Sequence, residues 1–94
     1  MLTENACLSK SKNVPWRIIE GEAILVNVNS SDIVHLNETG AEIWRIIDGK
    51  TSISKIIEHI SSVFEVNKEV AKTDVLELLK DLIEKNILEA SSFK

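Results

Sequence analysis

The residues that could do nucleophilic or acid–base chemistry are few and lie far apart in this chain. Its 94 residues include two histidines, His35 and His59, and one cysteine, Cys7. Nucleophilic catalysis needs a Ser, Cys or Thr beside a base. Neither histidine has the spacing of a catalytic triad or of a metal-ligand motif around it. The sequence therefore predicts no enzyme, no metal site and no cofactor.

Each of these three side chains has a structural explanation. His59 falls on the polar side of a predicted helix, so exposure to solvent accounts for it. His35 alternates with Val34 and Leu36 in a predicted strand, so it faces outward if those two face the core. Contact with a bound partner is the alternative for His35. Cys7 has no second cysteine to pair with, and we expect an incidental thiol.

Charge and hydropathy exclude several other classes of function. The net charge is −4 with a pI near 5.1, which argues against a binder of nucleic acid or of anionic membranes, because phosphate contacts need a basic face. The three glycines are too dispersed to form a phosphate-binding loop. The first fifteen residues lack the apolar run of a signal peptide, and no segment has the length of a membrane span. We therefore expect a cytoplasmic protein.

Three short antiparallel strands are predicted to come first. Residues 16–20 and 23–29 are dense in β-branched residues and flank a tight turn, which indicates a hairpin. A second turn leads into a third strand at 33–36. A sheet this small leaves at least one strand with unpaired amides and carbonyls, which need protection or serve as a template for another chain. The third strand carries neither Pro nor Lys to protect its edge.

Three helices are predicted to follow. The first begins after Asn37, whose side chain can accept hydrogen bonds from the first-turn amides, and ends at Gly49. The second begins after Thr51 or Ser52, and the third and longest covers residues 68–85. The expected fold is therefore an α+β, winged-helix-like domain with a three-stranded antiparallel sheet followed by three helices.

The predicted domain occupies most of the chain. Residues 1–15 are polar and end in Pro15, so we expect a flexible N-terminal arm. The folded domain is expected over residues 16–90, with a tail at 91–94. Apolar residues make up 44% of the chain, which allows a single aliphatic core that needs no disulfide bond or bound metal.

The third helix has an unusually wide apolar surface. One stripe is assigned to the core and contains Ala71, Val75, Leu78 and Leu82. A neighbouring stripe contains Leu76, Leu79 and Ile83, with Lys68 and Lys72 at its N-terminal end. The second stripe is interpreted either as more core packing or as one wall of an apolar groove beside the third strand. With two lysines at one end, such a groove suits an amphipathic peptide with acidic residues.

Two motifs between the last strand and the second helix resemble a known family. They are Leu-Asn-x-x-Gly-x-x-Ile-Trp at residues 36–44 and Asp-Gly-x-Thr at 48–51. With the order of strands and helices around them, they resemble the family of the pyrroloquinoline quinone biosynthesis protein D, over residues 16–89. Asn86 departs from the Gly usual in the family, but Asn also tolerates the left-handed backbone region.

The resemblance implies a non-catalytic peptide-binding adaptor. Members of the family recognise ribosomally made precursor peptides, whose leader is added as a strand against the third strand, with the third helix as the other wall. The partner is then a precursor peptide together with a maturation enzyme, most often a radical S-adenosylmethionine enzyme; a lasso-peptide protease or another maturase is the alternative. Matching positions give the peptide-binding residues Ile33, Val34, His35, Leu36, Lys72, Leu76, Leu79 and Ile83.

Two other functions fit the same elements. A winged-helix DNA-binding regulator also has three helices and a small sheet. The predicted third helix is slightly acidic overall, which is the wrong sign for a recognition helix. The third interpretation of the sequence is a structural subunit of a larger assembly.

Overall fold

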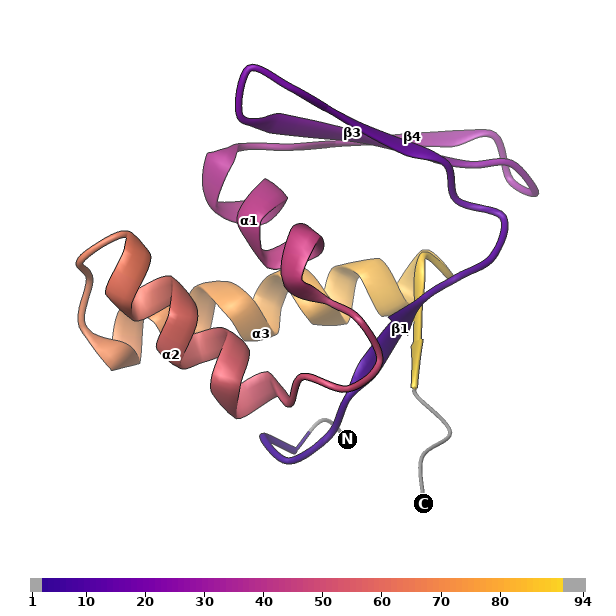
Figure 1. Ribbon diagram of the computed structural model, residues 1–94. Helices are drawn as coiled ribbons and strands as arrows, with labels where there is room; N and C mark the ends of the chain where they lie inside the picture. Colours follow the sequence, from indigo (N-terminus) through magenta and orange to yellow (C-terminus); the bar gives the residue numbers. More distant parts are fainter. Residues whose placement is uncertain (1–2, 91–94) are drawn as a thin grey trace.

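A three-stranded antiparallel sheet followed by three helices forms the body of the molecule, as predicted (Figure 1). The computed structural model describes residues 3–90, so the predicted tail at 91–94 lies outside the described residues. The elements in chain order are β1 (Leu8–Lys10), β2 (Trp16–Ile19), β3 (Glu22–Asn27), β4 (Asp32–Leu36), α1 (Glu38–Ile46), α2 (Ile53–Val63), α3 (Lys68–Glu84) and β5 (Leu88–Ala90). The main sheet has the strand order β2-β3-β4.

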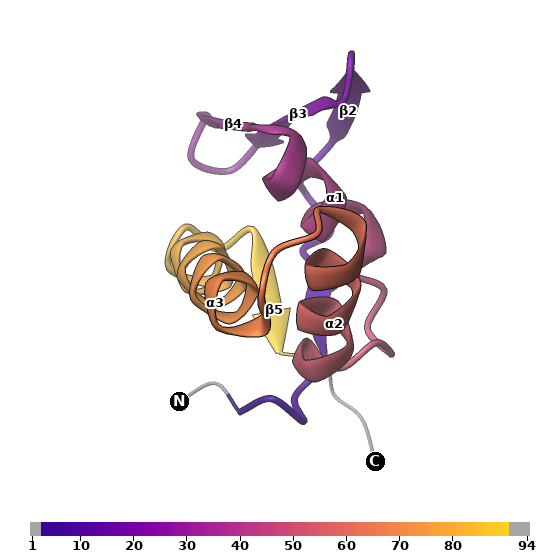
Figure 2. The same ribbon diagram turned by 90° about the vertical axis from the view of Figure 1, so that its left-hand side faces the viewer.

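The sheet forms one layer and the helices pack beneath it (Figures 1 and 2). Helix α1 lies between the sheet and the other two helices and contacts β3, β4, α2 and α3. Trp44 of α1 is fully buried at this junction, and the ring of Trp16 from β2 meets it edge-on, with centroids 6.0 Å apart. Aliphatic side chains fill the rest of the core, as the composition indicates.

The side chain of Asn27 fixes the sheet relative to the C-terminal end of α3. Asn27 is buried at the end of β3, and its Nδ2 donates to the carbonyl of Lys85 at 3.0 Å. Its Oδ1 accepts from the amides of Asn29 and Ser30 in the β3–β4 turn. A buried amide with its hydrogen bonds satisfied holds a defined geometry. The spacing between β4 and α3 is therefore set partly by this residue.

Helix α1 ends three residues earlier than Gly49, where the sequence predicts its stop. The last helical residue is Ile46. The carboxylate of Asp48 then accepts hydrogen bonds from the amides of Lys50 and Thr51, at 2.9 and 2.8 Å. Because Asp competes with the helix for backbone amides in this way, it ends the helix before the glycine is reached. Gly49 does adopt the left-handed region, with φ of 82°, but within the connecting loop.

The predicted flexible arm over residues 1–15 is wrong in its second half. Strand β1 pairs antiparallel with β5, so the two ends of the chain form a second sheet. Leu8 and Val14 are both buried in the core. The folded domain therefore starts well before residue 16. The pairing partner lies about eighty residues away in sequence, and the short polar segment around β1 gave no local signal of it.

Candidate functional site

Strand β4 presents an open edge. It pairs with β3 through residues 32–36, and within the described residues no strand pairs with its other side. Val34 and Leu36 face inward and are partly or fully buried, whereas Ile33 and His35 face outward and are exposed, as predicted. The imidazole of His35 meets the carboxylate of Glu22 on the outer face, at 3.0 Å.

The ladder shows which backbone groups of β4 are unused. In an antiparallel pair, successive residues direct their N–H and C=O groups to opposite sides. The amide of Val26 donates to the carbonyl of Pro15, so Val26 points toward β2, and the neighbouring Leu25 points toward β4. Leu25 is paired with Val34. Val34 therefore points toward β3, and the N–H and C=O groups of Ile33 and His35 point to the open edge.

The opposite edge of the sheet, on β2, is also open among the described residues. There the N–H and C=O groups of Trp16 and Ile18 point outward, because the bond from Val26 places Pro15 on the side that faces β3. All four residues of β2 are exposed, and Arg17 adds a charge to the strand.

A hollow lies beside the open edge of β4. It encloses about 450 Å³, and we call it the β4–α3 groove. Its residues come from the end of β4, the first half of α1 and one flank of α3, and they are His35, Leu36, Asn37, Thr39, Gly40, Ile43, Asp74, Glu77, Leu78 and Asp81. Figure 2 shows β4 above α3, with α1 beside them.

A close approach between β4 and α1 shapes one end of the groove. Asn37 caps α1 by accepting from the amide of Gly40 at 2.9 Å, as predicted. A Cβ atom on Gly40 would lie 3.1 Å from the Cβ of Leu36. Any larger side chain at position 40 would therefore push the end of β4 away from the helix.

The α3 side of the groove carries three carboxylates around one apolar side chain. Leu78 is half-buried, and Asp74, Glu77 and Asp81 surround it on the same flank of the helix. Asp81 forms an ion pair with Lys85 at 2.8 Å. Asp74 and Glu77 are exposed and have no hydrogen-bond or ion-pair partner in the described part of the chain. The groove residues include no Lys or Arg.

The predicted helix wall does not coincide with the β4–α3 groove. Leu79 is fully buried in the core and Leu78 is not, which reverses their predicted places. None of the predicted wall residues Lys72, Leu76, Leu79 and Ile83 lines the groove. At 100° per residue, Lys72, Leu76 and Ile83 share the flank of α3 opposite to Leu78.

The N-terminal segment contacts the start of that opposite flank. The ammonium of Lys72 forms an ion pair with Glu4 at 2.8 Å, which raises the pKa of Lys72. The carbonyls of Glu4 and Ala6 accept from the amides of Ser54 and Ile53 at the start of α2. Lys72 is thus engaged by the segment that the sequence predicted to be a flexible arm.

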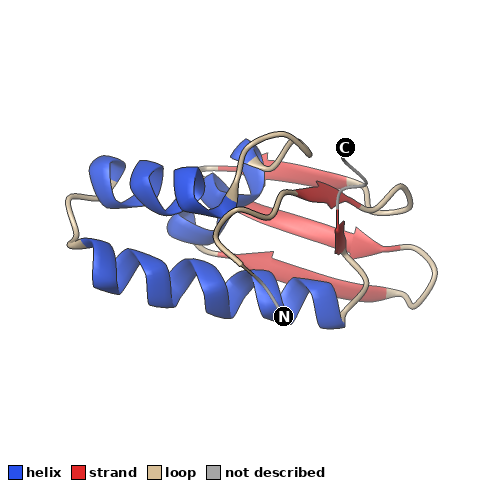
Figure 3. Ribbon diagram, turned by 90° about the horizontal axis from the view of Figure 1, so that it is seen from below, coloured by secondary structure: helices blue, strands red, loops and turns tan. Residues whose placement is uncertain are grey.

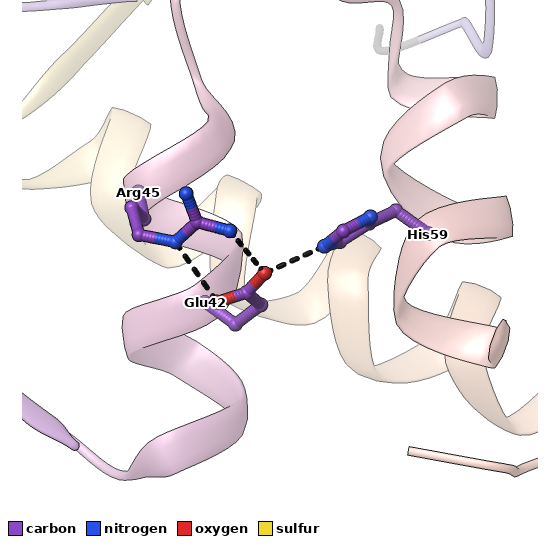
Figure 4. Close-up of polar contacts among 3 residues, drawn as sticks. All are labelled: Glu42, Arg45 and His59. Atoms are coloured by element: carbon purple, nitrogen blue, oxygen red, sulfur yellow. Dashed lines mark hydrogen bonds and ion pairs between the residues drawn. The ribbon is translucent and has the colours of Figure 1, made fainter. Parts of the chain in front are cut away.

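A second polar cluster links α1 to α2 (Figure 4). The carboxylate of Glu42 accepts from Nε and Nη2 of Arg45, at 3.0 and 2.6 Å, and its Oε2 lies 2.6 Å from Nε2 of His59. The bonds from Arg45 and then from His59 lower the pKa of Glu42 to about 2. His59 was predicted to face solvent; its side chain is in fact only 36% exposed and joins the two helices. The Glu42–Arg45 pair has helical i,i+3 spacing, but the contact with His59 has no local signal.

The described residues hold no group of three His, Cys, Asp or Glu side chains arranged to bind a metal ion. No helix among residues 3–90 is long and apolar enough to cross a membrane. Cys7 is a half-buried free thiol. Thus the β4–α3 groove and the open strand beside it are the strongest candidate for a functional surface in this part of the chain.

Comparison with known families identifies the fold and its lineage. The family model described as "Coenzyme PQQ synthesis protein D (PqqD)" matches residues 22–88, which include β3, β4 and all three helices. The chain belongs to the PqqD family. A relative from Gluconobacter oxydans (strain 621H), named "PqqA binding protein", is 46% identical over 46 residues. That match covers 49% of this chain and 48% of the relative, so the chain spans about half the length of the relative.

Two solved structures share the PqqD fold. One is described as "TbiB1 in Complex with the TbiA(beta) Leader Peptide"; it matches with a TM-score of 0.79 at 21% identity, over 92% of this chain and 98% of its own. The other is the solution structure of the PqqD truncation of Methylobacterium extorquens PqqCD, described as a stand-alone recognition element for ribosomally synthesised and modified peptides. It matches with a TM-score of 0.77 at 18% identity, over 95% of each chain. Both confirm the predicted α+β architecture.

Proposed function

We propose that this chain is a non-catalytic adaptor that binds the leader of a ribosomally made precursor peptide by strand addition along β4. The single observation that carries the proposal is the open edge at Ile33 and His35 directly beside the β4–α3 groove. Backbone hydrogen bonds to this edge give affinity, and the groove selects among side chains on the inner face of the added strand. The relative named for binding PqqA and the fold shared with a leader-peptide complex support the same function.

The bound precursor is then presented to a modifying enzyme. A radical S-adenosylmethionine enzyme is the partner we propose, with a lasso-peptide protease or another maturase as the alternative. Precursor, adaptor and enzyme would meet in the cytoplasm, where the precursor is translated. The DNA-binding alternative has no support from the site, because α3 carries five acidic and three basic residues and its groove flank is acidic.

The proposal is tested by titrating the ¹⁵N-labelled full chain with the leader of a short precursor encoded beside its gene. We expect the largest amide shifts at residues 33–36 of β4 and at 74–81 of α3. If the largest α3 shifts occur at Lys72, Leu76 and Ile83 instead, the leader binds along the opposite flank of α3. Shifts confined to α2 would contradict strand addition at β4.

A further inference from the structure

Two of the three carboxylates of the β4–α3 groove have no partner among the described residues that would explain them. Asp74 and Glu77 are spaced i,i+3, and Glu77 and Asp81 are spaced i,i+4, so each pair places like charges next to each other on the helix surface. Such pairs destabilise a helix. Lys85 pairs with Asp81 at the C-terminal end, which leaves the two other carboxylates without a partner among the described residues. They are exposed, but they line the same hollow as the apolar side chains of Leu36, Ile43 and Leu78.

The groove and the open edge together restrict what an added strand can present. Side chains of a strand alternate between its two faces, so those on the inner face recur every second residue, about 6.8 Å apart. Figure 3 shows α3 and the strands of the main sheet running in a similar direction. Along α3, Asp74 and Asp81 are about 10 Å apart, with Leu78 between them, at 1.5 Å per residue. Three successive inner-face side chains of an added strand span about 14 Å, roughly 3 Å more than this distance.

We propose that the leader bound here presents an apolar side chain to Leu78, with a Lys or Arg two residues before and two residues after it. This inference rests on the proposed strand addition and deepens it by naming the side chains that the groove selects. The flanking basic residues would meet Asp74 and Asp81, with Glu77 at the rim between them. Their long side chains span the small difference between the strand and helix spacings. The charge preference is opposite to the acidic peptide that the sequence favoured when Lys72 was assigned to the wall.

The test is a selection from a displayed library of random fourteen-residue peptides, run on three full-length proteins. The first is the wild type, and the second carries Asp74→Asn, Glu77→Gln and Asp81→Asn. The third is a matched control that loses the same charge at exposed carboxylates outside the groove, namely Glu58→Gln, Glu69→Gln and Glu89→Gln. We expect Lys or Arg to be enriched two residues on either side of an aliphatic residue with the wild type and the control. The enrichment should disappear with the groove variant.

The best selected peptide is then synthesised and titrated into the labelled proteins. Its affinity for the groove variant should fall about 2- to 30-fold, as expected for the loss of two exposed ion pairs, and the loss should shrink at high salt. Selected peptides without basic enrichment, or the same enrichment with the groove variant, would overturn the charge inference. In either case, shifts at the Ile33 and His35 amides would leave the proposed strand addition standing. Binding of a basic peptide without those shifts, or no binder at all, would overturn strand addition.

Discussion

Proline at position 35 removes one hydrogen-bond donor from the open edge of β4. The ladder directs the N–H of His35 away from β3, and that of Val34 toward it. Proline lacks the amide hydrogen, and strands tolerate it where that hydrogen faces outward at an edge. His35→Pro should therefore leave the β3–β4 pairing in place and remove one bond to the leader.

The expected loss follows from the value of one backbone hydrogen bond. Such a bond contributes about 0.5–1.5 kcal/mol, so the dissociation constant for the leader should rise about 2- to 13-fold. Isothermal titration calorimetry of the full chain with the cognate leader measures this change. The melting temperature of the free variant should stay close to that of the wild type.

Two matched variants separate the amide from other effects. His35→Ala removes the imidazole and its ion pair with Glu22 but keeps the amide, so the leader should bind nearly as tightly as to wild type. Val34→Pro removes a donor that faces β3 and should lower the melting temperature clearly. A folded His35→Pro variant with wild-type affinity, or a loss in His35→Ala equal to that in His35→Pro, would refute the assignment of this amide to leader binding.

Three further variants test the rest of the structure. Leu79→Ala should lower the free energy of unfolding by about 2–5 kcal/mol in a denaturant titration, because it empties a fully buried position; a surface-like effect would contradict its place in the core. Glu42→Gln should make the free energy of unfolding less dependent on pH in the acid range. The carboxylate of Glu42, whose pKa is lowered from 4.5 to about 2, stabilises the fold above pH 4.5, and this contribution is lost as the pH falls toward 2. Thermal melts of wild type and variant at several pH values in that range measure the difference. If the melting temperatures of both fell equally with pH, the Glu42–Arg45–His59 cluster would not stabilise the fold in this way. Lys72→Glu should leave leader affinity unchanged, because Lys72 pairs with Glu4 on the far flank of α3. A large loss of affinity in calorimetry would indicate that the leader contacts that flank instead.

Local signals were sufficient for most of the fold. The cap of α1 at Asn37 and the order of strands and helices are as the sequence indicates, and Ser52 is the cap of α2 among the two candidates. Each depends on hydrogen bonds within a few residues, which side-chain chemistry specifies directly. The alternation of Val34 and Leu36 against His35 likewise fixes which face of β4 is buried.

The wall of the groove could not be assigned in the same way. Helix α3 has apolar residues on both sides of its buried stripe, with Leu78 on one flank and Leu76 and Ile83 on the other. The helical period gives the width of such a surface but not which flank faces the sheet. That choice depends on contacts far apart in sequence, such as Asn27 with Lys85 and Glu4 with Lys72. The pairing of β1 with β5 is equally non-local.

Amide hydrogen exchange on the two edges of the sheet tests the central claim most directly. In the free protein the amides of Ile33 and His35 on β4, and those of Trp16 and Ile18 on β2, should exchange quickly, because the ladder directs all four outward. With saturating leader, we predict strong protection at Ile33 and His35 and unchanged exchange at Trp16 and Ile18. Protection on β2 instead, or no new protection at either edge despite binding, would contradict strand addition along β4.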